Sequence, residues 1–307
     1  MRRGLWVESA LVLVVVGLGF ALSPFLYGNE SLLFSMMAYV ALAQGLNIAY
    51  GFTGYLPFGY VGFFGSGAYG TALAIMFLHA PPIAAVVGGG LLAVIFGIVL
   101  APLLRLSGAY FAIANLAASQ ALYFVVANPH LSNITQGPYG IKLTSVFAPT
   151  ESYATLWVIV LLATAVAIYL RVSRFGLALR AINQDAQSAE VAGVNVVRGR
   201  LVAWLLSALV AGLAGGAYGW HISVFYPHSV FTLRISIFAI VFVLFGGAGT
   251  VIGPIIGAVL LYGLYDVIGI STPEYFQLIY GLLIIALVLF LPNGLLSLVR
   301  KRVRYVL

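Results

Sequence analysis

The sequence has no cysteine and few charged residues. Asp, Glu, Lys and Arg make up 7% of its 307 residues, against about 25% in a typical soluble protein. The absence of cysteine excludes a disulfide framework, a thiol nucleophile and a thiolate metal site. The chain is 63% hydrophobic, with a mean hydropathy of +1.12. A soluble fold of this size cannot bury so much apolar surface, so the composition predicts a polytopic integral membrane protein.

Lysine is also rare, and its positions exclude one way of binding ATP. A phosphate-binding P-loop requires Gly-Lys followed by Ser or Thr, whereas the only lysines, Lys142 and Lys301, follow Ile141 and Arg300. The four histidines have no helical metal spacing with another ligand, and no Gly-x-Ser-x-Gly motif is present. We therefore expect no metal, no cofactor and no enzymatic activity in this chain, with any energy source outside it.

Apolar runs long enough to cross a bilayer, about 20 residues each, recur along the chain. They predict an all-α fold of about ten transmembrane helices in a single domain, 1–307. The N-terminal run lacks a small-residue cleavage site, so we expect it to be retained as a helix. The expected spans are roughly 5–26, 31–50, 60–78, 83–104, 107–127, 153–170, 201–222, 233–248, 251–268 and 275–291.

Positive charge is concentrated between and beyond these runs. Arginines cluster near the N-terminus, in the polar segment 171–200 and in the basic C-terminal tail. An even number of spans places all three clusters on one side, which the positive-inside rule makes cytoplasmic. We therefore expect both termini and 171–200 in the cytoplasm, and the long loop 128–152 outside. The net charge of +7 therefore reflects the arginine clusters on the cytoplasmic side of the membrane. It gives no evidence for a nucleic-acid partner.

Within the polar segment, residues 183–193 read as one short helix. Asn183 is a suitable N-cap, Asp185 falls in the first turn, and Gly193 can end the helix in a left-handed conformation. A helix of about nine residues is not stable alone in water. It therefore needs a surface to pack against.

Two features of this short helix indicate contact with such a surface. Ala186, Ala189 and Ala192 repeat every three positions and give it one smooth side. Glu190 lies in the last turn, where the helix dipole disfavours a carboxylate, so a cation on a partner would suit it. The alternative is a solvated cytoplasmic loop with incidental helicity.

Two membrane stretches are interrupted by glycine and proline. Paired interruptions in two halves of a chain can mark a transporter in which unwound backbone lines the path. The alternative is tight helix packing, which glycine also serves in membranes. The helix-breaking glycines are Gly51, Gly54 and Gly59 in the first stretch, and Gly246, Gly247, Gly249 and Gly253 in the second.

Ordered motifs over most of the chain resemble those of a known family. Any one glycine pattern is common, but the set in this order is specific: Gly51-x-Thr53-Gly54-x-Leu56-x-x-Gly59, Gly108-x-Tyr110-Phe111-Ala112-Ile113, Ser173-x-Phe175-Gly176-x-Ala178-Leu179-Arg180, Glu190-x-x-Gly193-Val194-Asn195 and Gly246-Gly-x-Gly249-x-x-x-Gly253-Pro254. On these motifs the chain is similar to the LivM-type permeases of branched-chain amino-acid ABC transporters (LivH/LivM family). The resemblance implies an ABC importer permease fold in a prokaryotic cell (inner) membrane, and translocation of leucine, isoleucine and valine.

The resemblance also implies partners and a role for the short helix. In such importers the cytoplasmic helix between the sixth and seventh spans couples the permease to an ATPase subunit by seating in its groove. The implied partners are two ABC ATPase subunits, a second LivH-like permease and an extracytoplasmic substrate-binding protein, within membrane lipid. The implied coupling residues are Arg180, Asp185, Ala186, Ala189, Glu190 and Gly193.

A translocation path between two permeases would be lined by polar residues of the spans. The candidates are Gln44, Asn47, Thr53, Tyr110, Asn115 and Gln120. Alternatively, these side chains hydrogen-bond neighbouring helices. The chain departs from the family pattern at Tyr55, Pro57, Asn115, Gln120 and Phe238. The last two replace carboxylates of the family, which makes the path less polar and leaves another amino acid, a urea-like amide or an aromatic acid open as the substrate. An ATPase-independent facilitator and a structural membrane subunit are the alternatives of other classes.

Overall fold

The structure is a computed structural model that describes residues 2–271 and positions 278, 281–282, 285, 289 and 294–296. Side chains are described from residue 10 onward, apart from 26, 270 and 271. The tenth expected span, 275–291, and the basic C-terminal tail lie largely outside the described residues. The described part is almost entirely helical, as the composition predicts.

The first half of the chain forms five long helices with short connections. Its elements are α1 (Arg2–Leu26), α2 (Glu30–Leu46), a π-helical turn (Asn47–Gly51), α3 (Val61–Leu78), α4 (Pro82–Val99), a 3-10 turn (Ala101–Arg105) and α5 (Gly108–Val126). A structured connection follows, with 3-10 turns at Pro129–Leu131, Gly137–Tyr139 and Thr144–Val146, the short helix α6 (Ser132–Thr135) and strand β1 (Ile141–Lys142).

The second half places two short helices between long ones. Its elements are α7 (Pro149–Val172), α8 (Arg174–Gln184), α9 (Ala186–Val191), α10 (Val196–Ile222), β2 (Val224–Phe225), α11 (Pro227–Val230), α12 (Leu233–Gly246) and α13 (Ile252–Ser271). Within the described residues, 8 helical stretches are long and apolar enough to cross a membrane, and α1 adds the shorter apolar stretch Ala10–Phe25. The prediction of an all-α fold of about ten spans is therefore confirmed.

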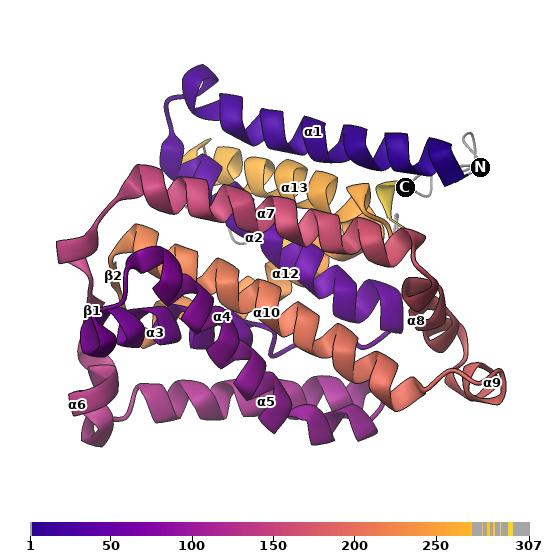
Figure 1. The fold of residues 1–307 in the computed structure, drawn as a ribbon. Coiled ribbons are helices and arrows are strands. Elements are labelled where there is room, and N and C mark those ends of the chain that lie inside the picture. Colours follow the sequence, from indigo (N-terminus) through magenta and orange to yellow (C-terminus); the bar gives the residue numbers. More distant parts are fainter. Residues whose placement is uncertain are drawn as a thin grey trace.

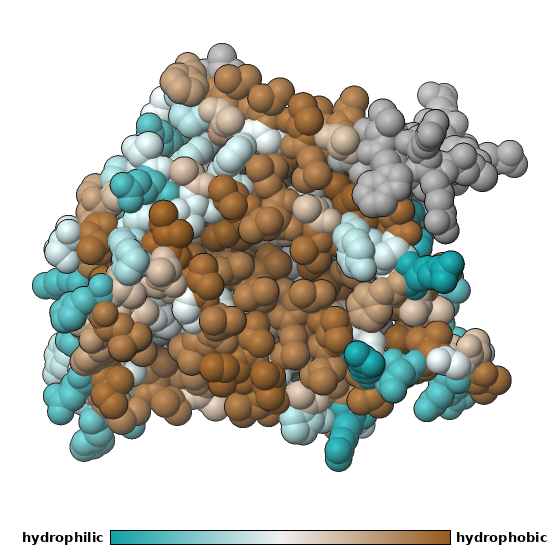
Figure 2. Space-filling view, viewed as in Figure 1, coloured by the Kyte–Doolittle hydropathy of each residue, from teal (hydrophilic) through white to brown (hydrophobic). Residues whose placement is uncertain are grey.

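The long helices run side by side and leave two polar ends (Figure 1). One end holds α8, α9 and the beginning of α1; we call it the α8–α9 end. The opposite end holds β1, β2 and α6; we call it the β1–β2 end. Figure 2 shows a broad hydrophobic surface between hydrophilic patches at the two ends. Exposed side chains such as Leu11, Ile83 and Ile95 suit hydrocarbon rather than water.

Helices α3, α4 and α10 form the most closely packed group of the core. Trp204 and Trp220 on α10 and Phe63 on α3 are fully buried. Each indole is also hydrogen-bonded, Trp204 Nε1 to the Gly97 carbonyl at 2.9 Å and Trp220 Nε1 to the Val146 carbonyl at 2.8 Å. The core thus gives its polar indole groups partners within the chain.

The connection between α5 and α7 is fixed to the end of α10. Strands β1 and β2 pair antiparallel, with Ile141 opposite Phe225 and Lys142 opposite Val224. Leu143 N donates to the Ser223 carbonyl at 2.6 Å. The 128–152 region, expected as a structured external loop, therefore forms an ordered cap at the β1–β2 end.

Close approach between α3 and α10 depends on glycine, because a methyl group at Gly67 would collide with the Gly212 backbone. We expect Gly67→Ala to lower the free energy of unfolding by about 1–3 kcal/mol, since the helices must separate. Thermal unfolding in detergent measures this. The control is Gly88→Ala, whose new methyl group meets nothing closer than the Ala74 Cβ at 4.0 Å. Equal stability of the two variants would contradict the packing argument.

Candidate functional site

The two glycine-rich interruptions lie against each other at the α8–α9 end. The π-helical turn after α2 meets the loop between α12 and α13, in which Gly247 and Gly249 have positive φ values of 118° and 76°. A side chain at Gly51 would collide with the Asn47 Oδ1 and the Gly249 N. Segments about 200 residues apart in the sequence therefore form one junction, which we call the helix-break junction (residues 44–54 and 246–251).

Side-chain amides replace the missing helical hydrogen bonds in this junction. Asn47 accepts from Gly249 N at 2.8 Å and donates to the Thr250 carbonyl at 2.7 Å. Gln44 Nε2 donates to the Val251 carbonyl at 2.8 Å. Both amides are completely buried. In hydrocarbon an unpaired backbone group is costly, so these two side chains are what allow the helices to end inside the protein.

The start of α3 is supported in the same way. No side chain caps this helix at Tyr60, yet its first N–H groups need acceptors. Gly59 N donates to Asn115 Oδ1 and Val61 N donates to Ser236 Oγ, both at 2.8 Å. Helices α5 and α12 therefore hold the α3 start within the membrane-spanning layer.

At the α8–α9 end, each helix begins at a side-chain cap. Ser173 caps α8, Asp185 caps α9 and Asn195 caps α10 through bonds to backbone N–H groups two or three residues on. A hydrogen bond from the Ser188 hydroxyl, with one from the Gln187 N–H, lowers the pKa of Asp185 below its ordinary value. Gly193 has φ +87°, the left-handed conformation expected there.

The prediction of a single helix capped at Asn183 is wrong. Asn183 belongs to α8, and the chain turns at Asp185 before the six-residue α9 begins. Helix α8 continues through Asn183 because Leu179 and Ile182 are buried against α10. The Asn183 side chain instead donates to the Gly51 carbonyl at 3.1 Å.

The α8–α9 segment is tied directly to the helix-break junction. Besides Asn183, Arg171 Nη1 at the end of α7 donates to the Gly249 carbonyl at 3.3 Å. The Arg200 guanidinium lies 4.5 Å from the centroid of the Tyr55 ring, a cation–π distance. Arg180 donates to the carbonyls of Gly176 and Arg171 at 3.4 and 3.3 Å and holds α8 against the end of α7. Side chains at the α8–α9 end are therefore hydrogen-bonded to both interrupted segments.

The small-residue side of α9 faces the chain itself. Ala189 is only 4% exposed, and Ala186 packs beside it on the apolar cluster of α8 and α10. Of the three alanines on the expected smooth side, Ala189 is thus covered by the chain itself and Ala186 partly so, whereas Ala192 is exposed. The free side carries Glu190 and Val191, whose side chain is 92% exposed. Sequence reasoning missed Val191, although a valine in so polar a segment was the available signal.

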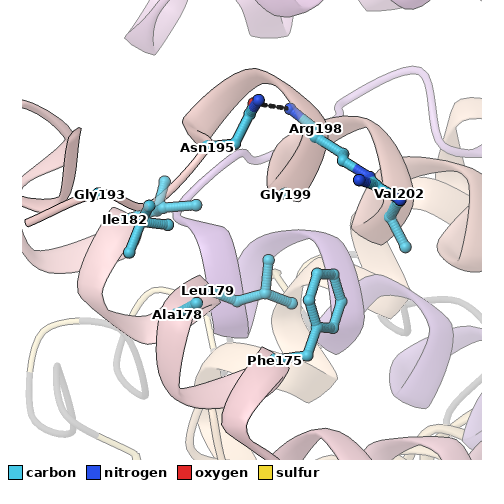
Figure 3. Close-up of a pocket in the computed structure, with 10 residues that line it drawn as sticks. Phe175, Ala178, Leu179, Ile182, Gly193, Asn195, Arg198, Gly199 and Val202 are labelled. Carbon is cyan, nitrogen blue, oxygen red and sulfur yellow. Dashed lines mark hydrogen bonds between the residues drawn. The ribbon is translucent and has the colours of Figure 1, made fainter.

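A cavity of about 560 Å³ lies between α8 and the start of α10. Figure 3 shows Phe175 and Leu179 of α8 pointing toward the side of α10 that carries Gly199 and Val202. The Asn195–Arg198 cap lies at its edge (Figure 3). The free surface at this end therefore combines the exposed side of α9, which carries Glu190 and Val191, with this neighbouring apolar cavity.

The six residues predicted to line a translocation path lie in different surroundings. Thr53 donates to the Ala49 carbonyl within its own turn. Tyr110 is 77% exposed on α5. Gln120 lines a cavity beside α5, while Gln44, Asn47 and Asn115 bond to backbone at the interruptions.

A multi-pass helical bundle with interrupted helices, tied to an exposed polar segment at one end, defines a membrane transport permease. Residues 29–288 match the sequence model of the family described as branched-chain amino acid transport system / permease component. The chain belongs to this family. It is accordingly a multi-pass protein of the prokaryotic cell (inner) membrane and a transport component rather than an enzyme.

Individual relatives agree with this assignment. The high-affinity branched-chain amino acid permease LivM of Escherichia coli is 28% identical over 343 aligned residues, covering 99% of this chain and 77% of the relative. The probable LivH permease of Methanocaldococcus jannaschii is 30% identical, covering 67% and 63%. The fructose import permease FrcC of Rhizobium meliloti is 35% identical, covering 42% and 37%. No solved structure matches the chain significantly.

Asn47 offers a test of the helix-break junction. We expect Asn47→Leu to lower the free energy of unfolding by about 2–4 kcal/mol, because the Gly249 N–H and the Thr250 carbonyl lose their partner while buried. Thermal unfolding of the purified chain measures this. Asn133→Leu, at an exposed position of α6, is the control and should unfold near the wild-type temperature. An unchanged midpoint for Asn47→Leu would show that the amide does not hold the junction.

Proposed function

We propose that the chain is the translocating subunit of an ATP-driven importer and that the α8–α9 segment is its coupling element. The observation that carries the proposal is the link to the helix-break junction. Asn183 of α8 donates to Gly51, and Arg180 of α8 is bonded to Arg171 of α7, which donates to Gly249. A partner that moves α8–α9 would pull on backbone at both interruptions. The sequence has no P-loop, so we assign the movement to another subunit.

The charge distribution supports the orientation that this role requires. The α8–α9 end carries Arg171, Arg174 and Arg198, whereas the β1–β2 end carries Glu30, Lys142 and Glu151. The positive-inside rule assigns the arginine-rich end to the cytoplasm. ATPase subunits would then contact α8–α9 from the cytoplasm, and a substrate-binding protein would dock on the ordered cap at the β1–β2 end.

Within the α8–α9 segment, two groups of residues have different tasks. The exposed Glu190 and Val191 would contact the ATPase directly. Arg180, Asp185 and Gly193 would hold the segment in shape, through a brace to α7, the α9 cap and the left-handed turn. Ala186 and Ala189 would seat α9 on the chain's own core.

We assign branched-chain amino acids as the substrate, on the basis of the LivM and LivH relatives. A second permease of the LivH type would complete the path, since α5 lies at the edge of the bundle (Figure 1). Because a fructose import permease is among the relatives, another small solute is the second candidate for the substrate. A facilitator that needs no ATPase is the alternative of a different class.

Reversing the charge of Glu190 tests the coupling role. We expect Glu190→Lys to reduce the ATPase that co-purifies with the solubilised complex about tenfold or more, because a mismatched charge in an interface costs several kcal/mol. Substrate-stimulated ATP hydrolysis should fall with it. Arg180→Glu should act in the same direction by loosening α8 from α7.

The matched control is Glu151→Lys, the same charge reversal at an exposed position of the β1–β2 end. It should leave the ATPase bound. Unchanged assembly and uptake in both Glu190→Lys and Arg180→Glu would refute the coupling assignment. Purification of the wild-type chain alone under gentle extraction, with uptake intact, would favour the facilitator.

A further inference from the structure

We infer that the cavity between α5 and the α11–α12 turn holds the substrate during passage and selects a neutral, aliphatic amino acid. This inference rests on the proposed function and adds a site to it. The cavity measures about 340 Å³, near the lower end of the range of small-molecule sites. Its lining combines Leu116, Phe231 and Leu233 with Gln120, Tyr123, His228 and Thr232.

The chemistry of this lining suits a zwitterion with an apolar side chain. The Gln120 amide both donates and accepts, and the hydroxyls of Tyr123 and Thr232 do the same. Together they can bond an ammonium group and a carboxylate, while Leu116 and Leu233 contact an aliphatic side chain. The lining contains no Asp, Glu, Lys or Arg. The only lining side chain that can become a cation is His228, so the cavity has no permanent counter-ion for a solute with net charge.

The backbone around the cavity is irregular where a transport site would need it. After β2 the chain forms only the four-residue α11, and α12 begins at Leu233. Irregular backbone at membrane depth is tolerated where it is buried or lines a cavity. His228 is exposed and lies three residues beyond β2, so the cavity opens toward the β1–β2 end, from which a binding protein would deliver substrate.

Phe231 forms the inner wall of the cavity, where it packs against other aromatic rings. Phe231 is 3% exposed and lies against Gly65 of α3, where a side chain would collide with its ring. The Tyr69 and Tyr123 rings lie 6.0 and 6.2 Å from it between centroids. This contact closes the cavity on the side of α3.

Unpaired polar atoms on α3 and α5, the helices next to the cavity, are a further observation. Tyr69 Oη, Asn115 Nδ2 and Ser119 Oγ are buried and have no hydrogen-bond partner among the described residues. Asn115 and Ser119 each directly precede a cavity residue of α5, Leu116 and Gln120. Buried polar atoms are rarely left without a partner. Their position is explained if water or a polar solute reaches this region during transport.

The absence of cysteine makes the cavity directly testable. Gln120→Cys would be introduced into the complex with its permease, ATPase and binding-protein partners, reconstituted in lipid vesicles. A membrane-impermeant thiol reagent added from the binding-protein side should label it. L-leucine with the binding protein and ATP should slow labelling of this subunit about tenfold when occupancy is high, whereas L-glutamate should not. Asn133→Cys, at an exposed position of α6 at the β1–β2 end, should be labelled equally with and without leucine.

A second variant measures the cost of losing the amide. Gln120→Leu should lower the maximal rate of leucine uptake about tenfold or more, since a hydrogen bond to a charged group of the substrate is lost. Subunit assembly and the unfolding temperature should stay unchanged, and Gln120→Asn should recover part of the rate.

Three results would overturn the inference. First, leucine could leave the labelling rate of Gln120→Cys unchanged. Second, the thiol could be inaccessible in every condition because the second permease covers it. Third, Gln120→Leu could take up leucine at the wild-type rate. If Glu190→Lys still reduces import relative to the wild type in those cases, the proposed function stands and the cavity assignment alone fails.

Discussion

The satisfaction of backbone hydrogen bonds inside a bilayer is the constraint on which the rest of this structure depends. A helix that ends within the membrane layer exposes N–H and C=O groups that lipid cannot pair. The chain interrupts its long helices and pairs several of the freed backbone groups with a side-chain amide, as Asn47 does for Gly249 and Thr250 and Asn115 does for Gly59. The interruptions are therefore stable features, held by a few specific side chains.

The same constraint explains how a signal from one end can reach the interior. Because single side chains hold the interruptions, we infer that moving a few hydrogen-bonded groups would change their backbone. Asn183 and Arg171 connect the α8–α9 end to the carbonyls of Gly51 and Gly249. A rigid bundle without interruptions would offer no such points of attachment. In the proposed importer, nucleotide binding by partner subunits would supply the free-energy difference between two arrangements of this junction.

Sequence reasoning was most accurate where a feature depends on neighbouring residues and least accurate where it depends on packing. Nine expected spans fall on observed helices, and Gly193 has the expected left-handed conformation. Asn183 and Asp185 are both good N-caps by type, and the wrong one was chosen because burial of Leu179 and Ile182 extends α8 past Asn183. The alanine repeat of α9 indicated a close contact, but the pattern cannot show that the contact is internal.

The sequence by itself determined the environment of this protein, the number and approximate bounds of most spans, and the family to which it belongs. These follow from apolar run length, charge placement and ordered motifs, which are properties of short stretches of chain. Only the tertiary structure decided that Gln44 and Asn47 close the helix-break junction, that Val191 faces outward and that Gln120 lines a cavity. These facts depend on residues such as Asn47 and Gly249, 202 positions apart, whose meeting is fixed by the packing of the whole helical bundle.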